Sequence, residues 1–316
     1  MITAFAVNNG ILEQRSVDGP DDLDQSIVWI DLVAPTAEER GWVEDACEQS
    51  LPTAEEMSEI EATARFFEDE DGLHVNSYFL YEDDDRYINL NVAFTLSNRR
   101  LFTLHDRDLP TFRMFRLRAR RQAEFATEAS EILLGLLETT VEQLADELEQ
   151  VYTSLESVSQ AVLSEETQNM HEALAQLATQ EDTTGKIRLS LMDKQRILSF
   201  LSRKSLLDGD DRQELREILR DVESLLSHTA FLFEKVNFLM DAAMGFINIQ
   251  QNQIIKIFSI AAVVFLPPTM IASIYGMNFV HMPELSWTFG YPLALLLMLL
   301  SGIAPYLYFR HKGWLR

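Results

Sequence analysis

Charged, polar and apolar residues are distributed very unevenly along the chain. Residues 257–275 and 285–309 contain no charged side chain, and Glu284 is the only charge between Lys256 and Arg310. A helix needs roughly 20 apolar residues to cross the hydrocarbon core of a bilayer. Both stretches are long enough, so the pattern predicts two membrane-spanning helices near the C-terminus rather than a buried hairpin in a water-soluble core.

The charges beside these two stretches predict their orientation. Lys256 precedes the first, whereas Arg310, Lys312 and Arg316 follow the second, and the segment between them has no Lys or Arg. Because cytoplasmic flanks are enriched in basic residues, both termini are expected in the cytoplasm and residues 276–290 outside. The N-terminus lacks the basic region and apolar run of a signal peptide, so we expect the first 250 residues to stay in the cytoplasm.

A proline-free segment between residues 111 and 266 is rich in Leu, Glu, Gln and Ala, which predicts long helices. Breaks are expected near 165–170 and 207–211, where Gly209 would end one helix. No clear stop signal lies between Asp210 and Pro267. A single helix over 210–275 would be roughly 100 Å long at about 1.5 Å per residue, too long for one compact domain.

The first hundred residues have a different pattern, with short runs of aromatic and β-branched residues between turn formers. Strands are predicted at 26–33, 64–69, 72–83, 88–96 and 100–106, and helices at 36–49 and 54–62. The fold class expected is an α+β cytoplasmic domain followed by long stalk helices and two C-terminal transmembrane helices. The predicted parts are residues 1–125 (mixed domain), 126–209 (helical region), 210–256 (stalk helix) and 257–316 (transmembrane domain).

Charge and motifs exclude several classes of function. The formal net charge is −24, and the first 256 residues hold 49 of the 50 acids. Such a surface repels phosphate, so we expect no nucleic-acid partner, whereas it suits cations. The single cysteine, Cys47, excludes a disulfide framework. The six histidines are scattered and no nucleotide-binding or nucleophile motif is present, so an enzyme is not expected.

The first apolar stretch has two different faces. Steps of three and four residues give a stripe of small or polar side chains, with a neighbouring line of bulky apolar residues that is able to meet lipid. Two helices cannot enclose a pathway alone, so a pore needs several copies around an axis. Small polar residues also pack helices together, and that alternative stays open. The stripe contains Asn252, Ile255, Ser259, Ala262, Leu266, Thr269, Ser273 and Gly276.

The sequence "YGMNF" at 275–279, followed by "MPEL" at 282–285, resembles the signature of the CorA family of magnesium transporters. The Gly-Met-Asn triplet lies at the end of the first of two C-terminal spans, as in that family. The resemblance includes "FFEDEDGLH" (66–74), "EQLADELE" (142–149), "FLMDAAMGFINIQQN" (238–252) and "PYLYF" (305–309), and is greatest to proteobacterial members. It therefore covers essentially the whole chain.

The resemblance implies a funnel-shaped homopentamer in the bacterial inner membrane that carries Mg²⁺ into the cell and also passes Co²⁺ and Ni²⁺. Gly276, Met277 and Asn278 match the selectivity filter. Among the stripe residues, Asn252 and Thr269 match polar pore-lining positions and Ile255 and Leu266 match apolar constrictions. A ring of amide oxygens would select hydrated Mg²⁺ without binding it too tightly. Glu284 in the outer loop would add negative potential.

The resemblance also implies that cytoplasmic Mg²⁺ regulates the pore through carboxylates at subunit contacts. The expected mechanism is that bound Mg²⁺ cancels the repulsion between facing acids and holds the pore closed. The candidates are Glu82, Asp83, Asp84 and Asp85 on the mixed domain, facing Glu217, Asp221 or Glu223 on a neighbouring long helix.

Two other functions are compatible with part of the pattern. A ZntB-like zinc transporter would share the architecture, although such proteins usually depart from Gly-Met-Asn and lack "MPEL". A membrane-anchored coiled-coil scaffold would explain the long helices. A scaffold has no use for Asn278 at a tight loop or for Thr269 within a bilayer, and this distinguishes it from a transporter.

Overall fold

The computed structural model divides into two compact units, Met1–Met240 (the body) and Asp241–Arg316 (the hairpin unit). The candidate Asp85 and most of the helix expected at 54–62 lie outside the residues that the structure describes. The described residues are 1–17, 19–53, 56–57, 65–84, 86–97, 100–123, 125–163, 170–204, 209–279 and 281–314.

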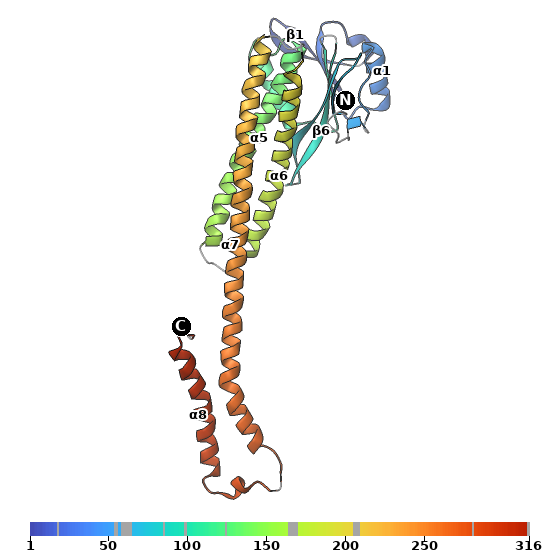
Figure 1. The fold of residues 1–316 in the computed structure, drawn as a ribbon. Helices are drawn as coiled ribbons and strands as arrows, with labels where there is room; N and C mark the ends of the chain where they lie inside the picture. Colours follow the sequence, from blue (N-terminus) through green and yellow to red (C-terminus); the bar gives the residue numbers. More distant parts are fainter. Residues whose placement is uncertain are drawn as a thin grey trace. The chain divides into compact units, whose positions relative to one another are not determined.

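The body contains a seven-stranded sheet in the order β2-β1-β3-β7-β6-β5-β4, in which only β3 and β7 pair in parallel (Figure 1). Five strands lie where the sequence predicts them. The pair β1–β2 was not predicted, although Asn9-Gly10 between them has the positive φ angles of a tight hairpin turn. The strands are β1 (Ile2–Asn8), β2 (Ile11–Ser16), β3 (Ile27–Val33), β4 (Phe66–Glu68), β5 (Leu73–Asp83), β6 (Arg86–Ser97) and β7 (Arg100–His105).

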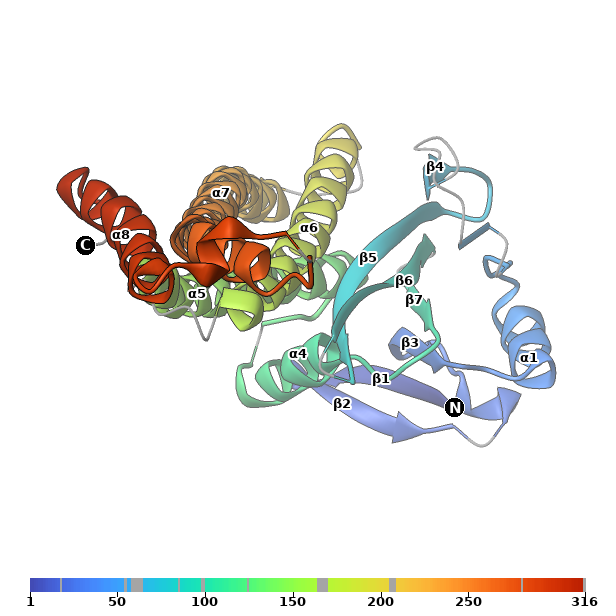
Figure 2. The same cartoon turned by 90° about the horizontal axis from the view of Figure 1, so that it is seen from below.

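Helices cover both faces of this sheet. Figure 2 shows α1 on one side and α4, α5 and α6 on the other. Trp29 stacks on Phe5 and meets the edge of Phe115 from α4, so aromatic side chains fill the second face. The helices are α1 (Ala37–Cys47), α4 (Pro110–Arg121), α5 (Ala129–Leu163), α6 (Met170–Leu201), α7 (Gly209–Tyr275) and α8 (Gly290–His311), with short 3₁₀ turns η1 (Pro20–Asp22) and η3 (Pro283–Ser286).

Helix α7 has 67 residues and confirms the single long helix that the sequence predicts. The role expected of Gly209 was wrong, because α6 ends at Leu201 and Gly209 is the first residue of α7. Within the body, the buried residues of α7 recur at intervals of three, four or seven, which is the spacing of a coiled-coil seam. They include Leu215, Ile218, Val222, Thr229, Leu232, Val236 and Leu239.

A buried group of charges clamps α6 to β5. Asp193 accepts a hydrogen bond from Arg65 Nη2 at 3.0 Å and from Ser77 Oγ at 3.0 Å. Lys194 Nζ donates to Ser77 Oγ at 2.7 Å and to the Tyr78 carbonyl. Burial lowers the pKa of Lys194 to about 8, and the adjacent Asp193 carboxylate opposes that shift. The clamp fixes the helical layer on the sheet.

Asp193→Ala should destabilise the protein by about 3–5 kcal/mol, because it removes one carboxylate of a buried ion pair with the Arg65 guanidinium. The matched control is Asp182→Ala, which removes an exposed acid paired with Lys186 on the same helix and should cost under about 0.5 kcal/mol. Thermal unfolding of the purified full-length protein in detergent compares the two. Equal losses of stability would contradict the clamp.

Candidate ion pathway and acidic sites

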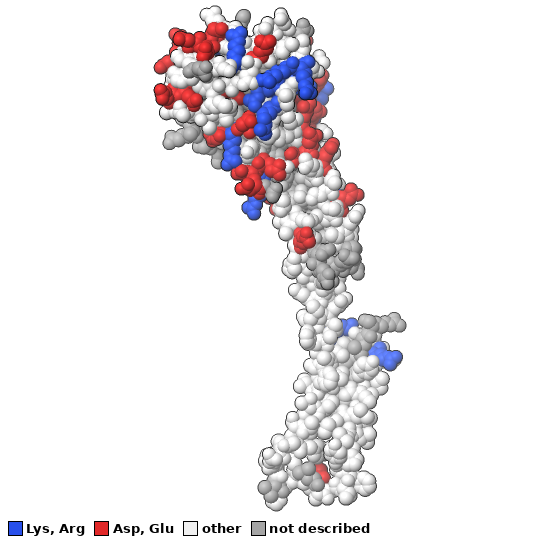
Figure 3. All heavy atoms as spheres, turned by 180° about the vertical axis from the view of Figure 1, so that it is seen from behind, with Lys and Arg blue, Asp and Glu red and all other residues white. Residues whose placement is uncertain are grey.

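The hairpin unit contains the end of α7, the turn η3 and α8. Both helices are long and apolar enough to cross a membrane, and only 6% of the most apolar window of either is buried in the chain. Figure 3 shows that charged side chains concentrate on the body and leave the surface of the hairpin unit almost free of charge. These two candidate spans lie where the hydrophobic pattern predicts them.

The two faces of α7 in this unit have different surroundings. Every residue of the predicted stripe is exposed in the single chain. The expectation that the neighbouring apolar line meets lipid was wrong for its middle part. Ile260 is only 6% exposed, and Pro268 lies so close to Gly302 of α8 that a Cβ added there would be 3.4 Å from its ring. The middle of the apolar line is therefore covered, with Pro268 against α8, whereas the stripe has no partner within the described chain.

Helix α7 continues through Pro267 and Pro268, so the phase of the stripe is kept as far as Tyr275. The two prolines have no N–H, and the carbonyls of Val263 and Val264 therefore lose their usual partners in the helix. Thr269 Oγ1 donates to the Phe265 carbonyl at 2.7 Å. Because that bond uses its only proton, the exposed Thr269 oxygen can act toward solvent only as an acceptor.

The Gly-Met-Asn segment follows directly after α7. The Gly276 amide donates to the Ala272 carbonyl at 2.9 Å, and Asn278 lies exposed beyond the helix end. Gly276 does not have a positive φ, so no left-handed backbone conformation requires a glycine here. A Cβ at Gly276 would lie 3.2 Å from the Ala272 carbonyl oxygen, which makes a larger residue tight there.

The loop after Asn278 returns through η3 to α8. Glu284 is exposed in η3, and its carbonyl lies so close to Gly290 that a Cβ there would be only 2.3 Å away. Exposed aromatic side chains flank both ends of α8, as expected for a helix anchored at two membrane surfaces. They are Trp287, Phe289 and Tyr291 at one end, and Tyr306, Tyr308 and Trp314 at the other.

The candidate regulatory acids form two groups on the body. Glu82 and Asp83 end β5, and Asp84 occupies the following turn with a φ of 47°. Asp83 Oδ1 pairs with Arg107 Nη1 at 2.8 Å. Among described residues, no group of three or more His, Cys, Asp or Glu side chains is arranged to hold a metal ion. The described acids of one chain therefore do not complete a magnesium site, although carboxylate oxygens are the ligands that Mg²⁺ prefers.

The second group lies between α5 and α7 and includes acids that sequence reasoning missed. Burial raises the pKa of Glu138, Arg118 opposes the shift, and Glu142, Asp221 and Glu217 add to it. Burial also raises the pKa of Glu214 to about 7, and the nearby charge of Glu138 contributes.

Glu217 and Asp221 thus have acidic neighbours in their own chain, whereas Glu223 is simply exposed. The signal available in the sequence was the heptad spacing of α7. Glu214 directly precedes Leu215, which belongs to the buried seam, so its side chain lies beside that seam.

Comparison with known proteins agrees with this architecture. The family model described as "CorA-like Mg2+ transporter protein" matches residues 24–311. The "Magnesium transport protein CorA" of Pectobacterium atrosepticum is 55% identical, and that of Escherichia coli strain K12 is 54% identical, each over the full length of both chains.

Two solved structures share the fold over 99% of this chain and 98% of their own. The CorA magnesium transporter from Methanocaldococcus jannaschii has a TM-score of 0.80 at 21% identity, and the full-length CmaX protein has a TM-score of 0.73 at 20% identity. The residues matched by the family model and the full-length identity lead to one conclusion: this chain belongs to the CorA-like Mg²⁺ transporter family.

Proposed function

We propose that this protein carries Mg²⁺ into the cell across the bacterial inner membrane, and that it does so as a homopentamer. The observation that carries the proposal is the stripe on α7, which is exposed in one chain and leads to Gly276, Met277 and Asn278. Polar side chains inside a bilayer are costly unless they face protein or water. The relatives named magnesium transport proteins, with more than half of their residues identical, support the same ion.

In the proposed assembly, five copies of α7 surround a common axis and five copies of α8 form the outer ring. Both termini are cytoplasmic and residues 276–290 face outside. Lys256 Nζ lies 5.8 Å from the ring centroid of Trp314, and Arg310 and Lys312 are near it in sequence. This grouping of basic and aromatic side chains supports a cytoplasmic interface at that end of the lipid bilayer.

Selectivity follows from how strongly Mg²⁺ holds its water. The ion dehydrates reluctantly, so a filter that strips its waters would be slow, and a ring of carboxylates would retain it. Five Asn278 amide oxygens accept hydrogen bonds from the water shell instead. Co²⁺ and Ni²⁺ have similar hydrated sizes and pass the same ring. Glu284 raises the local cation concentration near the outer mouth.

The closed state depends on apolar rings. Ile255 and Leu266 are 61% and 65% exposed in one chain, and their side chains belong to the stripe. Five copies of each make narrow hydrophobic constrictions that exclude water. Ser259 supplies polar surface between the two rings, and Asn252, Thr269 and Ser273 supply it beyond them.

Cytoplasmic Mg²⁺ regulates this pore in our proposal. Glu82, Asp83, Asp84 and Asp85 of one subunit face Glu217, Asp221 or Glu223 of the next, and the described acids of one chain give no group of three that could hold a metal ion. A divalent ion between subunits cancels their repulsion and favours the closed state, so the transported ion is its own effector.

Asn278→Ala should abolish Mg²⁺ uptake into liposomes while leaving the oligomer assembled, because it removes the ring of amide oxygens. The protein is reconstituted and uptake of Mg²⁺, Co²⁺, Ni²⁺ and Zn²⁺ is compared. His281→Ala, in the same exposed loop, is the control and should transport normally. Unaltered uptake by an assembled Asn278→Ala protein would contradict the filter, and a preference for Zn²⁺ would contradict the proposed substrate.

Leu266→Ser should raise leak conductance at high Mg²⁺ about tenfold or more, because a polar ring is wetted where an apolar one is dry. Phe265→Ser is the matched control, since Phe265 is 70% exposed but lies outside the stripe. Single-channel or bilayer recording measures both. Equal leak through the two variants would mean that Leu266 does not face the pathway.

Joint neutralisation of Asp83, Asp84 and Asp85 to Asn should shift the half-inhibiting concentration of cytoplasmic Mg²⁺ upward several-fold, because fewer carboxylates hold the regulatory ion. Asp21→Asn with Asp22→Asn serves as the control, since these acids are exposed elsewhere on the body. The measurement is a titration of Mg²⁺ against current. An unmoved midpoint in the triple variant would exclude this hairpin as the sensor.

A further inference from the structure

A positively charged side chain of the protein itself, that of Arg107, lies at the tip of the β5–β6 hairpin. Arg107 Nη1 lies 2.8 Å from Asp83 Oδ1, and its guanidinium carbon lies 5.3 Å from the ring centroid of Tyr81. The side chains of Arg107 and Asp83 are 46% and 41% exposed, so the pair is open to solvent. Among described residues, no ion pair joins Glu82 or Asp84 to a base. One arginine thus neutralises one of several hairpin acids.

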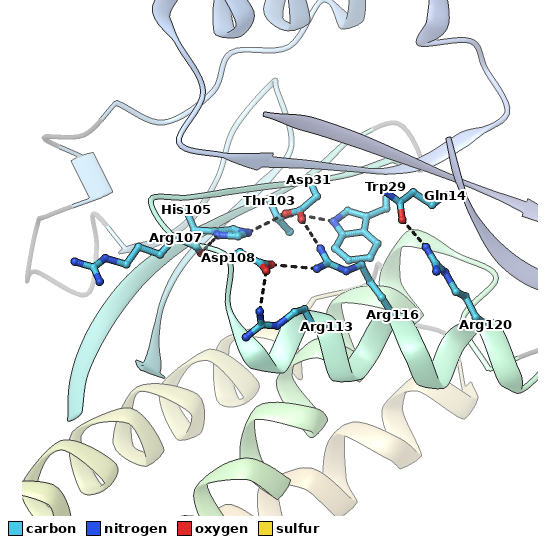
Figure 4. A network of polar contacts seen from close by, with 10 residues as sticks. All are labelled: Gln14, Trp29, Asp31, Thr103, His105, Arg107, Asp108, Arg113, Arg116 and Arg120. Atoms are coloured by element: carbon cyan, nitrogen blue, oxygen red, sulfur yellow. Dashed lines mark hydrogen bonds and ion pairs between the residues drawn. The ribbon is translucent and has the colours of Figure 1, made fainter. Parts of the chain in front are cut away.

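The backbone of Arg107 is fixed by a buried polar network, which Figure 4 shows from close by. His105 Nδ1 donates to the Arg107 carbonyl at 2.6 Å, and His105 Nε2 lies 2.9 Å from Asp31 Oδ1. Asp31 has no exposed side-chain surface and also accepts a hydrogen bond from Thr103 Oγ1 at 2.6 Å. The residue that carries the guanidinium is therefore anchored at the end of β7.

The same network reaches α4. Arg116 bridges Asp31 and Asp108, with both distances at 3.1 Å. In Figure 4 the side chain of Arg107 extends away from His105 and Asp31, so only its backbone takes part in the network. The guanidinium can therefore leave Asp83 without disturbing the buried bonds.

We propose that Arg107 is a tethered competitor of Mg²⁺ for the Asp83 carboxylate, and that it sets the cytoplasmic Mg²⁺ concentration to which the hairpin responds. The inference rests on the proposed regulatory role of the hairpin. At low Mg²⁺ the guanidinium occupies Asp83. At high Mg²⁺ the divalent ion displaces it, and Asp83 joins Glu82 or Asp84 and the acids of a second copy as an oxygen ligand.

The ion pair between Arg107 and Asp83 is weak, so Mg²⁺ can replace the guanidinium. An exposed pair of this kind is worth little, since solvent and salt screen it. Its removal should therefore tighten Mg²⁺ binding by about two- to fivefold, which is about 0.4–1 kcal/mol at 1.4 kcal/mol per tenfold change. A buried pair at the same place would block the site instead of adjusting its affinity.

The test measures Mg²⁺ binding to the full-length protein in detergent by titration calorimetry at constant ionic strength, with Mn²⁺ binding followed by electron paramagnetic resonance. Arg107→Gln should lower the dissociation constant two- to fivefold, whereas Arg107→Lys should stay close to the parent. Arg113→Gln is the matched control, because Arg113 on α4 forms a comparably exposed pair, at 3.3 Å, with Asp108 and not with a hairpin acid. It should leave the constant unchanged.

Asp83→Asn separates failure of this inference from failure of the proposed regulation. Weaker binding in Asp83→Asn together with unchanged binding in Arg107→Gln would overturn the competition alone. Unchanged binding in both variants would overturn the regulatory role of the hairpin and the inference with it. Equal tightening in Arg107→Gln and Arg113→Gln would show a general charge effect and would also overturn the competition. In the double variant Arg107→Gln with Asp83→Asn, the tightening should disappear.

Discussion

The structure depends on one continuous helix, α7, which begins in the charged body and ends in the apolar hairpin unit. The backbone of α7 must satisfy its own hydrogen bonds wherever lipid surrounds it, because no water is present there to replace them. It continues across Pro267 and Pro268 without ending, although these prolines leave the carbonyls of Val263 and Val264 without their usual donors, and it begins more than fifty residues earlier within the body. The same intervals of three and four residues first place Leu215 and Ile218 in a buried seam and later place Ser259 and Thr269 on one exposed face. A helix that broke between the two regions would lose this common phase.

The exposed stripe is also the reason for proposing that several copies assemble. In a single copy, α8 covers the line through Ile260 and Pro268, and nothing in the described chain covers Asn252 or Thr269. Apolar faces of membrane helices can meet lipid at little cost, whereas polar side chains there cannot. The body shows a related pattern, because its clustered acids are only partly neutralised by bases such as Arg107 and Arg118. In the proposed assembly, further copies would cover the stripe and cations would balance the acids.

Sequence patterns predicted the elements whose signals are local. The uncharged stretches, the proline-free helix and five strands were read correctly from residues next to one another. The strand β1 was missed because Ile2 to Ala6 are buried without alternation, so the period of two that marks a half-buried strand is absent. Gly209 was misassigned because its place in the chain suits a helix end and a helix start equally. Asp31, His105 and Arg116 form one network from three distant segments, and no spacing in the sequence reveals such a contact.

The claim that the α7 stripe lines a water-filled ion path is tested most directly by accessibility. Single cysteines are introduced in a Cys47→Ser background at Ser259, Thr269 and Ser273, and at Ile257 and Phe265 outside the stripe. Labelling by a small, charged thiol reagent is then measured in reconstituted protein with and without Mg²⁺. The account predicts that stripe positions are labelled and that Mg²⁺ slows the reaction, while the other positions react little. Equal labelling of both sets, or a stripe that stays unreactive under all Mg²⁺ concentrations, would contradict it.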